Sequence, residues 1–209
     1  MRWTVIVPMR ASARAKSRLR PASRSTAAHR ELVDAIRADC VAALRAAEVV
    51  AQVVVVAEDP GEITVADVLV VGEPAGAGLN GALRWAAAQA QARWPEDAVA
   101  AVVGDLAALR PRDVEAALDE AAGTGRAAVA DRQGSGTTVL TATPGHLLDP
   151  HFGLDSARQH RASGALFLAA APGLATDVDT PADLADAAAL GLGAHTAAVL
   201  SERAAGRSA

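Results

Sequence analysis

The chain has 209 residues, 51% of them hydrophobic, and carries a formal net charge of −4 at pH 7. This length suits one domain with a full core, so we expect a single domain over residues 1–209 whose tail frays after about residue 205. No apolar run approaches the ~20 residues that a membrane span needs, and the one cysteine, Cys40, excludes an internal disulfide framework and a multi-cysteine zinc site. We therefore expect a soluble, cytoplasmic protein with no membrane partner, in which Cys40 is a core thiol.

The first part of the chain predicts strands and helices in alternation. A β-branched run at residues 3–8 closes on a proline and predicts a buried first strand. A helix follows from about Ser25, with one apolar face and an Arg/Asp face that we expect to stay in solvent. Two apolar runs at 53–57 and 68–71 predict interior strands, and a helix is expected over 79–93.

The alternation continues through the middle of the chain. A strand is expected at 98–103, a helix begins at Pro111, and another strand is expected at 127–130. Strands that alternate with helices in this way are typical of βαβ units. The sequence therefore predicts an α/β fold with a largely parallel sheet.

The rhythm changes in the last third of the chain. A strand at 137–141, a helix near 156–162 and a last strand that leads to Asp177 predict a sheet of mixed topology there. A helix is then expected to begin at Pro181, and the alanine-rich stretch beyond Gly193 favours one more.

Basic residues are concentrated at the N-terminus. The first thirty residues hold eight basic and no acidic side chains, so residues 31–209 carry −12, with 12 basic against 24 acidic groups. This asymmetry favours an anionic ligand near the N-terminus. A nucleic-acid surface is the alternative, but Phe, Tyr and Trp make up only 2% of the chain and none lies between Arg10 and Arg30. We therefore expect no nucleic-acid partner.

The loop over residues 7–19 carries much of this positive charge. It follows the first predicted strand, and ligands of open α/β sheets bind at the carboxyl ends of strands. Bound polyphosphate needs several amide and cationic donors, which this loop offers, although it is not a Walker loop. The alternative is a solvated basic loop without a ligand.

A glycine-rich segment lies between the third predicted strand and its helix. Residues 76–81 fit G-x-G-x-x-G, which alone is a weak sign of dinucleotide binding. A second interpretation is a turn whose backbone and Asn80 amide contact a base or a ribose. A third is a plain turn that needs glycine for its positive φ.

Carboxylates follow two of the predicted strands. Asp105 comes after one strand, and Asp177 and Asp179 end another, on the same side of an extended chain. Carboxylate oxygens at strand ends suit Mg²⁺, which also bridges substrate phosphates. The alternative is that Asp179 or Thr180 only caps the helix that begins at Pro181.

Glycine and hydroxyl residues form a fourth motif, at 131–138 and 152–160. Their amides and Ser/Thr oxygens could bind the phosphate of a small acid. A hairpin turn followed by a helix N-cap is the alternative. The histidines lack metal-ligand spacing, and among them only His160 is a candidate for a substrate contact.

Together these motifs resemble the family of 2-phospho-L-lactate or phosphoenolpyruvate guanylyltransferases of coenzyme F-420 biosynthesis. The resemblance spans nearly the whole chain, through segments at 7–19, 78–83, 104–109, 134–138, 152–157 and 177–184. Two positions depart from the family pattern, because Arg10 replaces a lysine and Ala107 replaces a proline.

The resemblance implies a fold and an activity. The fold would be a single-domain, three-layer α/β nucleotidyltransferase fold, GT-A-like and Rossmann-like, with a mixed, mostly parallel central sheet. The activity would be transfer of GMP from GTP to phosphoenolpyruvate, or to 2-phospho-L-lactate or 3-phosphoglycerate, with release of pyrophosphate. The product would pass to the next transferase of the pathway.

The resemblance also assigns residues to the site. Catalysis would rest on Lys16 and Asp105, and Mg²⁺ would be held by Asp105, Asp177 and Asp179. The acid would bind at Thr138, Gly153 and Ser156. GTP would be bound by Pro8, Arg10, Lys16, Ser17, Arg18, Gly78, Leu79 and Asn80.

Two other functions remain open at this point. An oxidoreductase would use the glycine segment at 76–81 to bind a nicotinamide dinucleotide without Mg²⁺. A nucleotide sensor with the same fold would bind GTP without releasing pyrophosphate.

Overall fold

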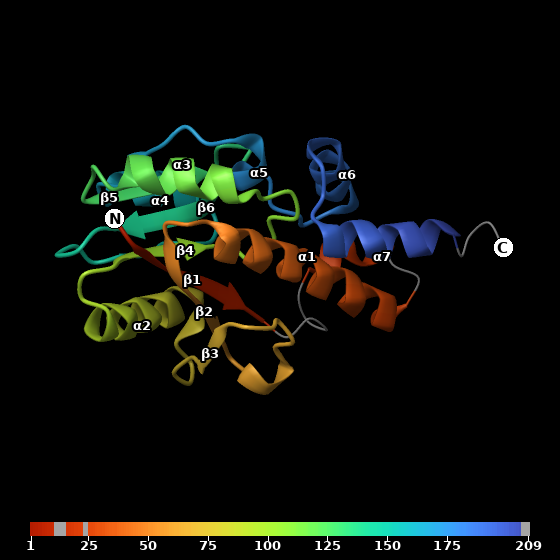
Figure 1. Ribbon diagram of the computed structural model, residues 1–209, viewed down its shortest axis with the longest axis horizontal. Coiled ribbons are helices and arrows are strands. Elements are labelled where there is room, and N and C mark those ends of the chain that lie inside the picture. Colours follow the sequence, from red (N-terminus) through yellow and green to blue (C-terminus); the bar gives the residue numbers. More distant parts are fainter. Residues whose placement is uncertain (11–15, 23–24, 206–209) are drawn as a thin grey trace.

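Seven strands form one sheet at the centre of the structure, which is a computed structural model describing residues 1–10, 16–22 and 25–205 (Figure 1). The strand order is β3-β2-β1-β4-β6-β5-β7. All neighbouring pairs are parallel except the two that involve β6, which runs antiparallel to β4 and β5, so the predicted mixed, mostly parallel sheet is confirmed. The strands are β1 (Trp3–Met9), β2 (Val50–Ala57), β3 (Leu69–Gly72), β4 (Ala98–Val102), β5 (Arg126–Ala130), β6 (Thr137–Ala142) and β7 (Leu166–Phe167).

Helices cover both faces of the sheet and complete three layers (Figure 1). Val5 and Val7 of β1 pack with α1 and α3 on one face, and Ile6 packs with α2 on the other. A smaller core joins α6 and α7 to α1. The helices are α1 (Thr26–Ala46), α2 (Gly78–Arg93), α3 (Pro111–Ala121), α4 (Ser156–Ala162), α5 (Pro172–Ala175), α6 (Pro181–Leu190) and α7 (Ala194–Ala205), with short 3-10 turns at Ser17–Ala22 and Pro60–Glu62.

Local signals set several boundaries. Helix α1 begins after Ser25, whose hydroxyl accepts a hydrogen bond from the Ala28 N–H at 3.1 Å. Cys40 in this helix is fully buried, and burial raises the pKa of its thiol to about 12. Cys40 is therefore an inert core thiol, as predicted. Among the described residues no single helix is long and apolar enough to cross a membrane, and α6 and α7 meet that test only as a pair bent by 115°.

Two strand predictions were wrong. The run at 68–71 was expected inside the sheet, but β3 is an edge strand that pairs only with β2, and Leu69 is 48% exposed. The strand expected before Asp177 is absent from this described segment, because Pro172 starts the short helix α5 there. The last strand of the sheet is instead β7, which pairs with β5.

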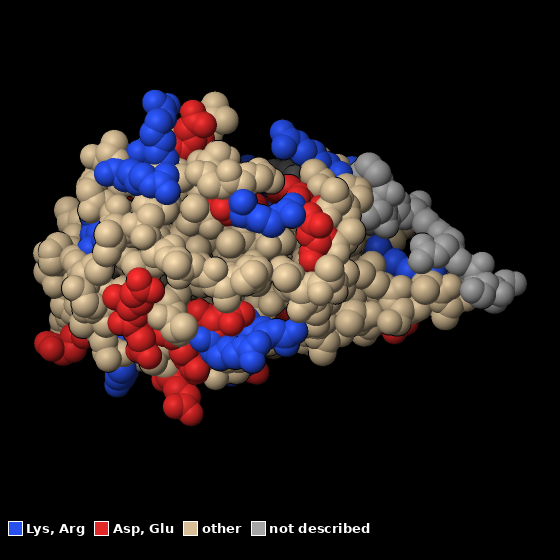
Figure 2. All heavy atoms as spheres, turned by 90° about the horizontal axis from the view of Figure 1, so that it is seen from above, with Lys and Arg blue, Asp and Glu red and all other residues tan. Residues whose placement is uncertain are grey.

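Charges of both signs mix on one face of the molecule. On the face that Figure 2 shows, Lys and Arg side chains lie in small groups near Asp and Glu side chains, with uncharged residues between the groups.

A buried carboxylate ties the C-terminal helix to the body of the domain. Asp39 of α1 is 6% exposed and accepts hydrogen bonds from the N–H groups of His195 and Thr196 at 2.9 and 2.8 Å. These are free amides of the first turn of α7, so Asp39 caps that helix from another element. Gly193 is needed beside it, because a Cβ there would lie 2.2 Å from the Asp39 Cγ.

Asp39→Ala is expected to lower the free energy of unfolding by about 2 kcal/mol, since two amides of α7 lose their acceptor. Urea unfolding followed by circular dichroism measures this. Asp119→Ala is the matched control, because Asp119 is an exposed aspartate on α3. Equal stabilities of the two variants would contradict the capping role.

Candidate functional site

A cavity of about 920 Å³ lies at the carboxyl ends of β1, β2 and β4. The start of α2 and one side of α1 complete its walls. The basic loop leads into it from β1, although residues 11–15 of that loop lie outside the described residues. Of the residues predicted to bind GTP, those that line this cavity are Pro8, Arg10, Lys16, Ser17, Arg18, Gly78 and Leu79.

The three predicted metal ligands lie close together, and two of them, Asp105 and Asp179, line this cavity. One carboxylate oxygen each from Asp105, Asp177 and Asp179 lies within 4.8 Å of the others. The two segments are joined by a hydrogen bond from the Val178 N–H to the Asp105 carbonyl at 3.1 Å. Val178 is fully buried and packs in the core cluster with α6, and in an extended chain its two neighbours lie on the same side, which agrees with their closeness to Asp105.

The helix that follows is capped by Thr180 and not by Asp179. The Thr180 hydroxyl accepts from the Asp183 N–H at 3.2 Å, and the Asp183 carboxylate accepts from the Thr180 N–H at 2.8 Å. This capping box satisfies the first turn of α6. The Asp179 side chain therefore remains available to the cavity, where it contacts Lys16.

The acidic cluster holds more negative charge than its one lysine neutralises. The Lys16 ammonium donates to Asp105 and Asp179; burial alone would lower its pKa, but these two carboxylates raise it above the ordinary value. Burial, and next the Asp105 charge, raise the pKa of Asp177 to about 6. Asp105 also keeps one buried oxygen without a hydrogen-bond partner in the described part of the chain. This donor set fits a divalent cation.

The glycine segment forms the turn before α2. Gly76 and Gly78 have φ of +73° and +62°, and nothing lies within 4 Å of a Cβ built on either, so backbone conformation and not space requires glycine. The turn follows the edge strand β3, whereas a dinucleotide fingerprint follows the first strand of its unit. The Asn80 amide does not line the cavity, because it bonds to the backbone of Phe152.

The residues predicted to bind the acid lie around the start of β6 and of α4. Thr138 is 1% exposed, and its hydroxyl has no partner among the described residues. Its carbonyl accepts from the Val103 N–H at 3.0 Å, which places it beside the end of β4, two residues before Asp105. Gly153 (φ +130°) and the buried Ser156 flank the first turn of α4, and none of these residues lines the 920 Å³ cavity.

Helix α1 contributes a cavity residue that sequence reasoning missed. Arg37 lines the cavity and is 8% exposed, although its helix face was expected to stay in solvent. Burial lowers the pKa of its guanidinium, and Asp34 lies 3.9 Å away. The apolar pattern alone could not reveal this, because the start of α7 and the cavity also cover polar residues of α1.

Solved structures share the fold at low sequence identity. A nucleotidyl transferase from Methanothermobacter matches with a TM-score of 0.58 and 15% identity, over 90% of this chain and 97% of that one. A protein from Desulfovibrio desulfuricans G20, provisionally named a nucleotide-diphospho-sugar transferase, matches with a TM-score of 0.74 and 16% identity, over 98% and 96%. Rv0371c of Mycobacterium tuberculosis in complex with manganese matches with a TM-score of 0.54 and 20% identity, over 90% of this chain and 97% of that one. The fold is therefore that of the nucleotidyltransferases.

Curated relatives are much closer in sequence. The phosphoenolpyruvate guanylyltransferase of Geodermatophilus obscurus is 46% identical over 95% of this chain and 94% of its own length. The protein of that name from Streptomyces coelicolor is 45% identical over 95% of this chain and 96% of its own length. Residues 3–202 match the family model described as guanylyl transferase CofC like. With this match the oxidoreductase alternative is set aside, and the chain belongs to the CofC-like guanylyltransferase family.

Proposed function

We propose that this chain transfers GMP from GTP to phosphoenolpyruvate, giving enolpyruvoyl-2-diphospho-5'-guanosine and pyrophosphate in coenzyme F-420 biosynthesis. The observation that carries nucleotidyl transfer is a cluster of three carboxylates, two of which line the cavity and contact Lys16. The choice of acid follows the relatives named phosphoenolpyruvate guanylyltransferase. The alternatives are the same reaction on 2-phospho-L-lactate or 3-phosphoglycerate.

The reaction is a displacement at phosphorus. A phosphate oxygen of the acid forms a bond to the α-phosphorus of GTP, and the bond from that phosphorus to the β-phosphate oxygen breaks, so that pyrophosphate leaves. A phosphate monoester has a second pKa near ~6, so its dianion is already present at neutral pH and no general base is needed. The work of the protein is to hold two anions together.

Asp105, Asp177 and Asp179 are the residues that would hold Mg²⁺, which supplies positive charge against the phosphates. Lys16 adds a second cation at the same place, and its contacts with Asp105 and Asp179 fix the ammonium beside them. Asp105 and Lys16 are therefore the two residues that we assign to catalysis.

The rest of the site divides between the two substrates. Thr138 offers a buried hydroxyl without a protein partner among the described residues, which suits an oxygen of the acid. Gly153 and Ser156 add a backbone amide and a second hydroxyl. For GTP we propose Pro8, Arg10, Lys16, Ser17, Arg18, Gly78, Leu79 and Asn80. We further propose that the protein works in the cytoplasm and hands its product to the next transferase of the pathway.

Pyrophosphate release tests the proposal. The purified chain is incubated with GTP, Mg²⁺ and each acid in turn, in the presence of the next pathway enzyme so that an unstable product is consumed. We expect release with phosphoenolpyruvate, and none with EDTA or without acid. GTP binding with silence for all three acids would identify a sensor and refute the proposal.

A further inference from the structure

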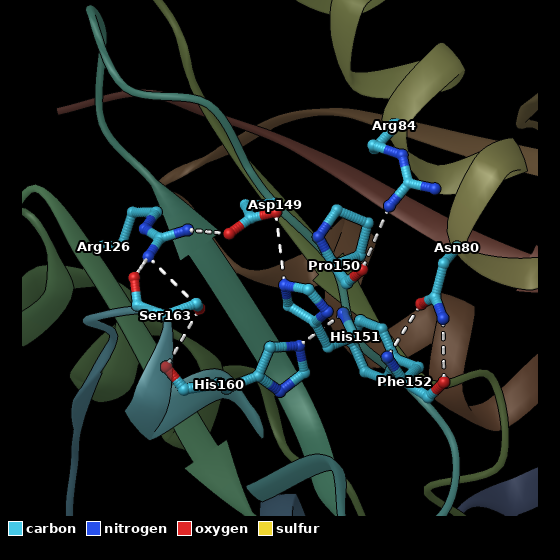
Figure 3. Close-up of polar contacts among 9 residues, drawn as sticks. All are labelled: Asn80, Arg84, Arg126, Asp149, Pro150, His151, Phe152, His160 and Ser163. Carbon is cyan, nitrogen blue, oxygen red and sulfur yellow. Dashed lines mark hydrogen bonds and ion pairs between the residues drawn. The ribbon is translucent and has the colours of Figure 1, made fainter. Parts of the chain in front are cut away.

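Two side chains of helix α2 hold the loop over residues 149–152 through hydrogen bonds to the main chain of that loop (Figure 3). The Asn80 amide nitrogen donates to the Phe152 carbonyl at 2.9 Å, and its amide oxygen accepts from the Phe152 N–H at 2.7 Å. One turn further along the same helix face, Arg84 donates to the Pro150 carbonyl at 3.3 Å. These side chains bond to main-chain atoms, so they fix where the loop lies and not which side chains it carries.

The paired bond of Asn80 joins two parts of the site. Asn80 directly follows Leu79, which lines the cavity proposed for GTP. Phe152 directly precedes Gly153, which we propose for the acid. Both partners of the pair are only half-buried, yet they lie 72 residues apart in the chain. The bond therefore sets the distance between the turn on the nucleotide side and the loop on the acid side.

The loop is held from its other side by a neutral histidine. The His160 Nε2 accepts from the His151 N–H at 2.9 Å, and Nδ1 lies 2.9 Å from the Thr137 hydroxyl. Burial lowers the pKa of His160 to about 4, so the ring is neutral near pH 7 and carries its proton on Nδ1. Thr137 is the residue next to Thr138, so this contact also ends at the acid side.

The first residue of the loop is anchored by charge. Asp149 accepts from Arg126 of β5 at 2.9 Å, and the His151 ring lies 3.3 Å from the same carboxylate (Figure 3). Arg126 also donates to the Ser163 carbonyl just after α4. The loop over residues 149–152 is thus fixed to β5, α4 and α2, and only the α2 contacts reach the nucleotide side.

We propose that Asn80 is a positioning residue for the acid substrate, which places Gly153 and the start of α4 at a fixed distance from the bound nucleotide. This role rests on the proposed function and replaces a direct contact between the Asn80 side chain and GTP. An amide has two N–H donors and one carbonyl oxygen, and here one donor and the oxygen are already bonded to Phe152. The contacts that the amide makes are therefore with the loop, and it does not line the cavity proposed for GTP.

Binding without turnover tests this role. Titration calorimetry with Mg²⁺ and a GTP analogue bearing an α,β-methylene bridge measures the affinity for the analogue, and then for phosphoenolpyruvate on the complex. Asn80→Ala is expected to weaken binding of phosphoenolpyruvate about tenfold or more and binding of the analogue less than about twofold, because the paired hydrogen bond to Phe152 is lost on the acid side. Asn80→Asp is expected to weaken phosphoenolpyruvate binding as much as Asn80→Ala does. The reason is that a carboxylate at this position has no N–H to donate to the Phe152 carbonyl.

Gln91→Ala is the matched control. Gln91 lies on the same helix and donates its amide to the His146 carbonyl at 3.0 Å, in the segment that leads into the loop, but far from the cavity. Its loss is expected to leave both affinities unchanged. Equal affinities of Asn80→Ala and the original chain for phosphoenolpyruvate, or an equal loss for the analogue and the acid, would overturn the positioning role.

Amide hydrogen exchange separates this role from the proposed function. Asn80→Ala is expected to speed exchange over residues 152–156, and Gln91→Ala is not. Unchanged exchange there would overturn the role of Asn80 whatever the acid. Absence of phosphoenolpyruvate binding by the original chain, with faster exchange in Asn80→Ala, would instead refute the proposed substrate and keep the contact that holds the loop.

Discussion

Asp105→Asn is expected to reduce pyrophosphate release by at least about a thousandfold, because an amide is a poor ligand where a carboxylate should share a divalent cation. The fold should remain, since the change removes one negative charge from a cluster that raises the pKa of Asp177 by its own repulsion and burial. Initial rates with GTP, Mg²⁺ and phosphoenolpyruvate measure the loss. The thermal midpoint measured in EDTA reports whether the variant is folded.

Manganese binding gives this prediction a second readout. The paramagnetic signal of free Mn²⁺ should fall on titration with the original chain and much less with Asp105→Asn. Asp119→Asn is the matched control, because Asp119 is an exposed aspartate on α3. Retained turnover or retained Mn²⁺ affinity in Asp105→Asn would remove Asp105 from the metal site.

Lys16→Met is expected to lower turnover by about a hundredfold or more, because the side chain keeps its reach but loses the charge that we propose lies against the GTP phosphates. The effect of the same change on thermal stability should depend on whether metal is present. In EDTA the thermal midpoint should fall, since Asp105 and Asp179 lose the ammonium that they both contact. Saturating Mg²⁺ should restore most of that loss.

Lys16→Arg is the control for charge alone. It keeps one positive charge and should keep the midpoint in EDTA closer to that of the original chain, although its planar fork fits the carboxylates differently. A midpoint for Lys16→Met that is unchanged in EDTA would show that the ammonium does not neutralise the cluster. Unchanged turnover would remove Lys16 from catalysis.

Local patterns predicted much of this fold because local chemistry decides it. Ser25 caps α1 through its own hydroxyl, and α4 spans Ser156–Ala162 as expected. The failures concern neighbours in space. A valine run such as that of β3 looks the same at the edge of a sheet as in its interior, and only the strand order shows that one side lacks a partner.

The sequence predicted the site to about the same extent as it predicted the fold. The sequence indicated that Asp105 and the Asp177–Asp179 pair belong together, since both follow predicted strands, and the structure brings them within 4.8 Å. It could not indicate that Asn80 bonds to Phe152, because that contact depends on how α2 packs against a loop 72 residues away. Nor could it show which of Asp179 and Thr180 caps α6. Which of these residues touch substrate stays a prediction.

The strand order has one more consequence. The chain leaves β1 through α1 toward β2, and it leaves β4 through α3 toward β5, which lies in the direction of the other edge of the sheet. The two connections diverge, so the crevice between them is a topological switch point of the fold. Under the proposed assignments, GTP binds at β1, β2 and β4, and the acid binds at β6 and α4. We therefore expect changes at β6 and α4 to alter which acid is accepted more than they alter GTP binding.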